Sequence, residues 1–174
     1  MMSLLQVECF QEHLRASQKL QMRNTRKLLK MANVALISVH PEYVNKIVSG
    51  EKLWEFRRTW AKSPVDFLVV YSTSPVKRIM AIIEIGEEIR GSKQKLWELS
   101  RDRQGGISRR KLFSYLNGKE EGVALQLKSK FVFKKGIDPN DVFGAGFRAP
   151  QSFQYMSQKE WSLIRDEAVR MSWE

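Results

Sequence analysis

The segment Gly50–Arg58 (GEKLWEFRR) constrains the fold more than any other part of this 174-residue chain. It places the aromatic residues Trp54 and Phe56 among charged side chains, in a pattern otherwise typical of a buried strand. Charges in such a strand are costly unless they are paired or face a cleft. We therefore expect this strand to carry a buried ionic network, a functional cleft, or both. Its charged residues are Lys52, Glu55, Arg57 and Arg58.

The residues before this segment predict a short strand followed by a short helix. Val34–Val39 is apolar almost throughout, which indicates a central strand. Pro41 suits the first turn of a helix, and Gly50 suits its end, because glycine readily adopts the left-handed conformation found there. We expect a helix over Pro41–Ser49, with the charged strand beginning at once after Gly50.

The rest of the chain predicts strands and helices that alternate irregularly, which is typical of an α+β domain. Apolar or alternating segments indicate strands at 66–72, 79–85 and 123–133. Helices are expected at 92–102, 108–117 and 157–171, and Ser157 with Glu160 fits a capping box at the start of the last one. The segments 59–64 and 136–146 are expected to be loops.

Residues 1–31 predict a basic amphipathic helix that precedes the domain at 32–174. Its acidic residues lie early and its basic residues late, as the helix dipole favours. We expect its apolar stripe to dock on the domain, on a second subunit or on a protein partner, with contact to a nucleic acid as an alternative. The stripe consists of Leu4, Val7, Phe10 and Leu14.

The composition narrows the class of partner. A net charge of +11 favours polyanions such as nucleic acid. Cys9 is the only cysteine, so the chain has no internal disulfide, and a cytoplasmic location is expected. No apolar run approaches the roughly 20 residues that span a bilayer, so no membrane partner is expected. His13 and His40 lack metal-ligand spacing and no nucleotide-binding fingerprint occurs, so neither a metal nor another cofactor is expected.

The charged strand also resembles a known family. Gly50, Lys52, Glu55 and Arg57 match, position for position, the G-x-K-x-x-E-x-R motif of the ASCH domain. The flanking segments HPEYVNKIVSG, VVYSTSPVKRI and APQSFQYMSQKEW follow in the expected order. The resemblance implies a small PUA-like β-barrel of about five or six strands with flanking helices. It further implies binding of nucleic acid, RNA rather than DNA, or of a modified nucleotide, in a regulatory role such as transcription regulation.

Within the charged strand, two interpretations stay open. In the functional one, Lys52, Arg57 and Arg58 contact phosphate or a base edge, and Glu55 orients them or accepts from an exocyclic amine. In the structural one, the same charges form a buried network that orients the helix-to-strand turn. Residues three apart face opposite sides of a regular strand, so Lys52 and Glu55 share a cleft only if Lys52 lies on the turn or the strand bulges.

Two further groups are candidates for nucleic-acid binding. The loop after strand 66–72 is either the lip of a cleft or a turn that satisfies its own backbone; its candidates are Tyr71, Ser72 and Ser74. The two-helix insertion is either a phosphate-contacting surface or a solvated helix face. Its candidates are Arg109, Arg110 and Lys111.

The resemblance also implies an enzymatic alternative, a hydrolase acting on RNA or on modified nucleosides through a Lys52/Glu55 cleft. One branch is similar to acetylcytidine amidohydrolase, in which a lysine, a threonine nucleophile and a glutamate act together. Lys52 matches that lysine, but Glu55 stands where the threonine would be and is no substitute for it. Another branch is associated with metal-assisted RNA cleavage, for which Lys52, Glu55 and Tyr43 are the acid–base candidates.

Overall fold

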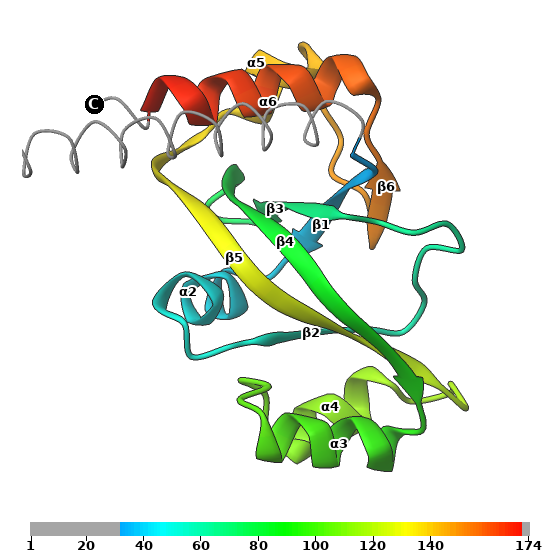
Figure 1. The fold of residues 1–174 in the computed structure, drawn as a ribbon. Helices are drawn as coiled ribbons and strands as arrows, with labels where there is room; N and C mark the ends of the chain where they lie inside the picture. Colours follow the sequence, from blue (N-terminus) through cyan, green and yellow to red (C-terminus); the bar gives the residue numbers. More distant parts are fainter. Residues whose placement is uncertain (1–31, 172–174) are drawn as a thin grey trace, which may run out of the picture. The chain divides into compact units, whose positions relative to one another are not determined.

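The long antiparallel strands β4 (Arg78–Gly91) and β5 (Gly122–Ile137) are the frame of the fold (Figure 1). They are seen in a computed structural model that describes residues 32–171. Their pairing shifts register at several points between Ile79 and Glu88. Shifts of this kind bend a strand and increase its twist. The pair therefore curls along its length and bends the whole sheet.

Six strands form one curled sheet in the order β2-β5-β4-β3-β1-β6, an open half-barrel. Strand β1 runs parallel to β3, and all the other neighbours are antiparallel. Strands β2 and β6 are the two edges, and no backbone ladder among residues 32–171 joins them. The remaining strands are β1 (Val34–Val39), β2 (Trp54–Arg57), β3 (Phe67–Ser72) and β6 (Phe153–Tyr155).

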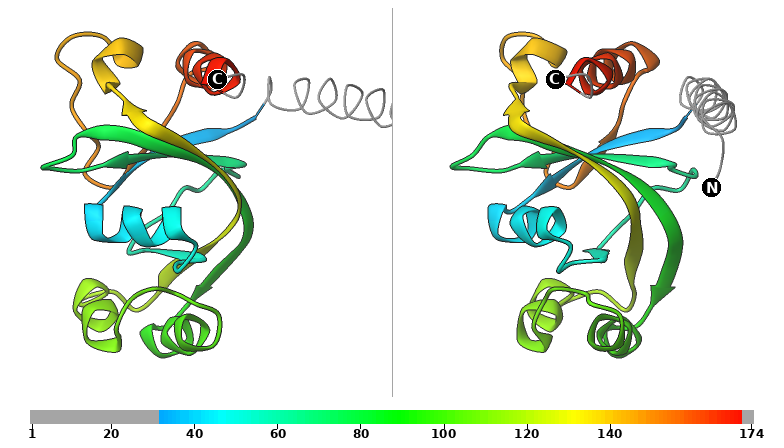
Figure 2. Two further views of the ribbon diagram at one scale, coloured as in Figure 1. Left: turned by 90° about the vertical axis from the view of Figure 1, so that its left-hand side faces the viewer. Right: turned by 60° about the vertical axis from the view of Figure 1, so that its left-hand side comes forward.

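Helices cover both faces of this sheet because its strands are apolar on both sides. On the concave face, helix α2 (Pro41–Ser49) buries Val44 and Ile47 against alternate residues of β1 and β3. Figure 2 shows α2 lying inside the curl of the sheet. On the opposite face, helix α6 (Gln158–Met171) stacks Trp161 on Phe67 with their ring centroids 5.8 Å apart. The short helix α5 (Pro139–Phe143) lies beside α6.

The insertion between β4 and β5 forms a second, smaller core against strand β2. It consists of helix α3 (Lys93–Asp102), a glycine turn and helix α4 (Arg109–Tyr115). Leucines of the insertion pack on Trp54 and Phe56. All four residues of β2 are buried. The carboxylate of Glu55 and the guanidinium of Arg57 are therefore held inside the protein. The leucines are Leu96, Leu112 and Leu116.

The expected α+β fold, a small barrel-like sheet with flanking helices, is confirmed, and the six-stranded sheet is curled into a half-barrel. Helix α2 begins at Pro41, and it ends at Gly50, which adopts the left-handed conformation with φ of 87°. The predicted capping box is present before α6, because the Ser157 amide donates to Glu160 Oε2 at 2.6 Å and the Glu160 amide donates to Ser157 Oγ at 3.3 Å. The predicted helix over 1–31 lies outside the described residues.

Several elements differ from the sequence prediction. Strand β2 begins at Trp54 rather than directly after Gly50, because the amides of Lys52 and Leu53 donate to Lys46 and Gln104 instead of to a strand. The expected loop 136–146 contains α5, which Asp138 caps by accepting from the Asn140 amide at 2.9 Å. Strands β4 and β5 are longer than predicted, because their polar ends still pair with each other.

No helix within residues 32–171 is long and apolar enough to cross a membrane.

The side chain of Arg57, at the end of β2, bridges the open side of the half-barrel. Its Nη2 donates to the carbonyl of Ser38 in β1 at 3.1 Å, and its Nη1 donates to the carbonyl of Ser152, just before β6, at 3.2 Å. The Ser38 hydroxyl in turn donates to the carbonyl of Pro150 at 2.6 Å. The two edges that no ladder connects are thus held together through the Arg57 guanidinium.

We expect Arg57→Met to lower the free energy of unfolding by about 3 kcal/mol, the scale for breaking a buried ion pair. The substitution removes both edge-to-edge hydrogen bonds and one partner of Glu55. Urea titration followed by tryptophan fluorescence measures the change. Arg58→Met is the matched control, because Arg58 is exposed and makes one hydrogen bond, to the Asn117 carbonyl. Equal losses for the two variants would contradict the bridging role.

Candidate functional site

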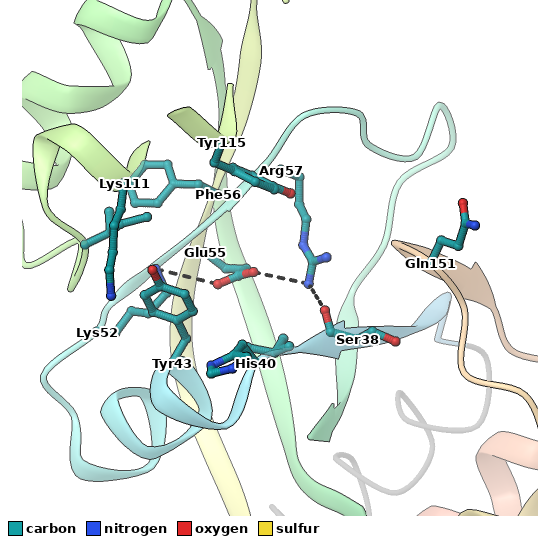
Figure 3. A pocket seen from close by; sticks show the side chains of 12 residues that line it. Ser38, His40, Tyr43, Lys52, Glu55, Phe56, Arg57, Lys111, Tyr115 and Gln151 are labelled. Atoms are coloured by element: carbon teal, nitrogen blue, oxygen red, sulfur yellow. Dashed lines mark hydrogen bonds and ion pairs between the residues drawn. The ribbon is translucent and has the colours of Figure 1, made fainter. Parts of the chain in front are cut away.

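A pocket of about 300 Å³ opens beside α2, between strand β2 and the α3–α4 insertion (Figure 3). Aromatic rings and charged groups line it together, and the end of β1 and the loop before β6 complete its wall. The lining residues are Ser38, Val39, His40, Tyr43, Lys52, Glu55, Phe56, Arg57, Ile107, Lys111, Tyr115 and Gln151.

The floor of the pocket is a buried ionic network in which one carboxylate pairs with two cations. Glu55 Oε1 lies 3.1 Å from Arg57 Nη2, and Glu55 Oε2 lies 3.6 Å from Lys52 Nζ (Figure 3). All three residues are at most 7% exposed. Buried charges require partners, and here two positive charges share one negative charge. The network therefore keeps a surplus of positive charge that suits an anionic or electron-rich ligand.

The position of Lys52 is set by the insertion as well as by β2. Its Nζ donates to the carbonyl of Gly105 at 2.8 Å, and it lies 4.9 Å from the centroid of the Phe56 ring. Gly106 has a φ of 65°, and a Cβ there would lie 2.7 Å from Lys52 Cβ. Only glycine fits a turn that approaches the lysine so closely. Burial lowers the pKa of Lys52, and the ion pair with Glu55 opposes that effect.

Three lysine ammonium groups surround the ring of Tyr43. Their Nζ atoms lie 5.4, 5.7 and 5.8 Å from the ring centroid, in Lys52, Lys111 and Lys46 respectively. Ammonium groups at this distance are attracted to the negative face of an aromatic ring. Burial raises the pKa of the Tyr43 phenol, so it is a neutral hydrogen-bond donor at physiological pH.

An ion pair across the rim of the pocket joins the insertion to α2. Lys111 Nζ lies 2.9 and 3.0 Å from the two carboxylate oxygens of Glu42, and Lys46 Nζ approaches the same carboxylate at 3.4 Å. Both side chains of the Lys111–Glu42 pair are exposed, at 53% and 40%. The hydrogen bond between them raises the pKa of Lys111 and lowers that of Glu42.

The structure brings together some of the sequence-predicted site residues and separates others. Tyr43, Lys52, Glu55, Arg57 and Lys111 line the pocket. Lys52 reaches the same cleft as Glu55 because it lies on the turn before β2, as the alternation of side chains requires. The other candidates are not among the lining residues; they are Arg58, Tyr71, Ser72, Ser74, Arg109 and Arg110.

The predicted lip of the cleft does not line the pocket: Tyr71 and Ser72 are part of the protein interior, and Ser74 is exposed on the turn after β3. Tyr71 and Ser72 end strand β3 with 6% and 1% exposure. The ring of Tyr71 packs edge-on against Phe147, with centroids 5.3 Å apart. In the insertion, Arg109 and Arg110 are exposed, and the Arg109 guanidinium lies 4.2 Å above the ring of Phe113. These two arginines form a surface near the pocket rather than part of its lining.

Several lining residues carried no clear signal in the sequence. Tyr115 reads as a core aromatic but is 38% exposed at the pocket. Its position four residues after Lys111 places both on one side of α4, so the helical repeat alone would have grouped them. Ser38 comes from strand β1, and His40, Ile107 and Gln151 come from three separate connections, so only the fold brings them together.

Within residues 32–171, no three His, Cys, Asp or Glu side chains are grouped as ligands of a metal ion.

Comparisons with known proteins agree with this geometry. Residues 37–116 match the ASCH domain family. A protein of Zymomonas mobilis named ASCH domain-containing ribonuclease is 28% identical over 128 residues, which make up 72% of this chain and 86% of that protein. The crystal structure of ASCH from Zymomonas mobilis superposes with a TM-score of 0.69 at 26% identity, covering 76% of this chain and 94% of that one. A tyrosine-to-phenylalanine mutant of that protein superposes with a TM-score of 0.68 at 26% identity, covering 76% and 96%.

We expect Lys52 to titrate below the ordinary lysine pKa of 10.5, because its burial disfavours the charged form. Lys111 provides the internal contrast, since its pKa is raised by Glu42. The ¹³Cε resonances of the two lysines, followed against pH, measure both midpoints. Glu55→Gln should lower the Lys52 midpoint further, because the carboxylate that favours the ammonium is removed. A titration midpoint of Lys52 at or above that of Lys111 would contradict the buried ionic network.

Proposed function

We propose, from the premise that this chain is an ASCH-domain protein with a PUA-like half-barrel, that its pocket binds one nucleotide, either unstacked from RNA or carrying a modified base. The observation that carries the proposal is that one pocket combines aromatic rings with a buried ionic network of surplus positive charge. A volume of about 300 Å³ is at the small end of ligand sites, which suits a single nucleotide rather than a duplex.

The pocket offers the contacts that single-stranded RNA recognition uses. Tyr43, Phe56 and Tyr115 supply ring faces for an unstacked base. Glu55 accepts from an exocyclic amine, and Lys52 donates to a carbonyl or phosphate oxygen. The Nε of Arg57 is buried and finds no acceptor among residues 32–171, so a ligand oxygen would supply the missing partner.

The neighbouring surface fits the rest of a polyanion. The insertion that forms one wall of the pocket also carries exposed basic residues, in a chain of net charge +11. Phosphate contacts of this kind supply affinity without sequence preference, while the pocket discriminates among bases. RNA as the preferred polymer, a role in regulation such as that of transcription, and a cytoplasmic location belong to the same proposal. So does an oligomer or a protein partner bound through residues 1–31.

RNA hydrolysis is a second candidate function, favoured by the name of the Zymomonas relative and by the lowered pKa of Lys52. A lysine that loses its proton more readily is a better general base, and the neutral Tyr43 phenol is a proton donor. Lys52 and Glu55 would then act on the nucleotide that the pocket holds. Hydrolysis adds turnover to the same binding mode, so binding and cleavage are to be measured on the same RNA.

We expect wild-type protein to bind single-stranded RNA more tightly than DNA of the same sequence, and to leave the RNA intact. Binding is measured by fluorescence anisotropy, and integrity by electrophoresis after incubation. Lys52→Met is the diagnostic variant, with a thermal melt to show that it is folded. Cleavage by the wild type that Lys52→Met abolishes would establish the second candidate. A folded Lys52→Met variant that binds every RNA and nucleotide like the wild type would overturn the pocket as the binding site.

We expect Arg109→Ala/Arg110→Ala to make the plot of log K against log salt concentration less steep. The magnitude of its slope should fall by up to about 1.4, since each phosphate contact to a single strand contributes about 0.7. Affinity should fall about equally for all RNA sequences, because these side chains lie outside the pocket. The matched control is Lys134→Ala/Lys135→Ala, a neighbouring pair of exposed cations on β5. If the control pair changes the slope as much, the insertion is not the preferred phosphate surface.

A further inference from the structure

We propose that the rim of the pocket contains a phosphate-binding subsite, formed by Lys46 and Lys111, which the carboxylate of Glu42 occupies until a ligand phosphate displaces it. This inference rests on the proposed function and adds to it the chemical group that is bound at the rim. Glu42 is then a built-in competitor for the ligand rather than part of the binding machinery.

The carboxylate of Glu42 is bound as a ligand phosphate would be. Its two oxygens lie 2.9 and 3.0 Å from Lys111 Nζ, and Oε1 lies 3.4 Å from Lys46 Nζ. The two lysines come from different elements, α4 and α2, and converge on one group of oxygens. Both lysines also lie within 6 Å of the Tyr43 ring, at 5.7 and 5.8 Å from its centroid. The subsite is therefore beside the ring on which a base would stack.

The charges around Tyr43 favour the exchange. Lys46, Lys52 and Lys111 surround its ring, and Arg57 shares Glu55 with Lys52. Within residues 32–171, the carboxylates that pair with these four cations are Glu42 and Glu55. A phosphate that replaces Glu42 brings its own negative charge and more acceptor oxygens than a carboxylate has. Glu42 is 40% exposed, so it turns into water at little cost once it is released.

A purely structural ion pair makes the opposite prediction. If the Lys111–Glu42 pair only fastened α4 to α2, removing the carboxylate would loosen the wall of the pocket and weaken every ligand. If Glu42 competes with phosphate, removing its charge strengthens ligands that carry phosphate and leaves those without it unchanged.

The test compares full-length wild-type protein with Glu42→Gln by calorimetric titration of AMP, CMP, GMP and UMP and of the corresponding nucleosides. We expect Glu42→Gln to bind the nucleotides about two- to fivefold more tightly, the scale of a removed exposed ion pair. Nucleoside affinity should not change. The matched control is Glu51→Gln, the same substitution just beyond the other end of α2, where the carboxylate accepts from the Ser49 hydroxyl.

A gain for Glu42→Gln that Glu51→Gln does not share supports displacement at the rim. Lys111→Ala should weaken nucleotide binding, and Glu42→Gln should then give no gain in the Lys111→Ala background. Equal affinities for Glu42→Gln and Glu51→Gln, weaker binding by Glu42→Gln, or an equal gain for nucleosides would overturn the subsite. Wild-type protein that binds none of the nucleotides and no RNA would overturn the proposed function, and the subsite with it.

The source of the phosphate is distinguished with short oligoribonucleotides. One set has hydroxyl groups at both ends, and the other carries a terminal phosphate. A gain from Glu42→Gln with both sets identifies an internal phosphodiester as the displacing group, and a gain with the second set alone identifies a terminal phosphate.

Discussion

The sharing of the Glu55 carboxylate between Lys52 and Arg57 is the interaction on which the rest of this structure depends. One buried carboxylate holds two cations, and each cation holds a different part of the chain. Arg57 binds the carbonyls of Ser38 and Ser152 and so joins the two edges of the half-barrel. Lys52 binds the carbonyl of Gly105 and so positions the turn of the insertion. Without the carboxylate, two buried cations would lie beside each other unpaired, which is strongly unfavourable.

This arrangement explains why structural and functional interpretations of the motif are not alternatives. The ammonium of Lys52 has three hydrogens, of which Gly105 and Glu55 account for two, and Nε of Arg57 has no acceptor within residues 32–171. Each cation is therefore fixed by the protein, and in the proposed function its remaining donor binds the ligand. Fixing the donors in advance lowers the entropy lost on binding. The stability of the half-barrel and the shape of the pocket consequently share the same bonds.

The sequence predicted the elements that local rules determine and missed the contacts that only the closed fold creates. Pro41, Gly50 and the Ser157–Glu160 box each mark a helix end through their own chemistry, so these boundaries were predicted correctly. The burial of Tyr71 and the placement of Tyr115 at the pocket depend on segments far away in the chain. Residue periodicity groups Tyr115 with Lys111 on one side of a helix, but it carries no information about which distant segments those residues face. The site residues on the motif, as well as Tyr43 and Lys111, could be named from the sequence, whereas Tyr115, Ile107 and Gln151 could not.

The pocket therefore divides into a part that is constrained by folding and a part that is not. Lys52, Glu55 and Arg57 are at most 7% exposed and are paired with one another, so a substitution among them disturbs the half-barrel as well as the pocket. Lys111, Tyr115 and Gln151 are exposed residues on the insertion and the loop before β6, and their side chains can change without breaking the frame. In a fold built this way, the motif supplies a fixed cationic floor, and the rim is the part of the pocket that can vary without loss of the fold.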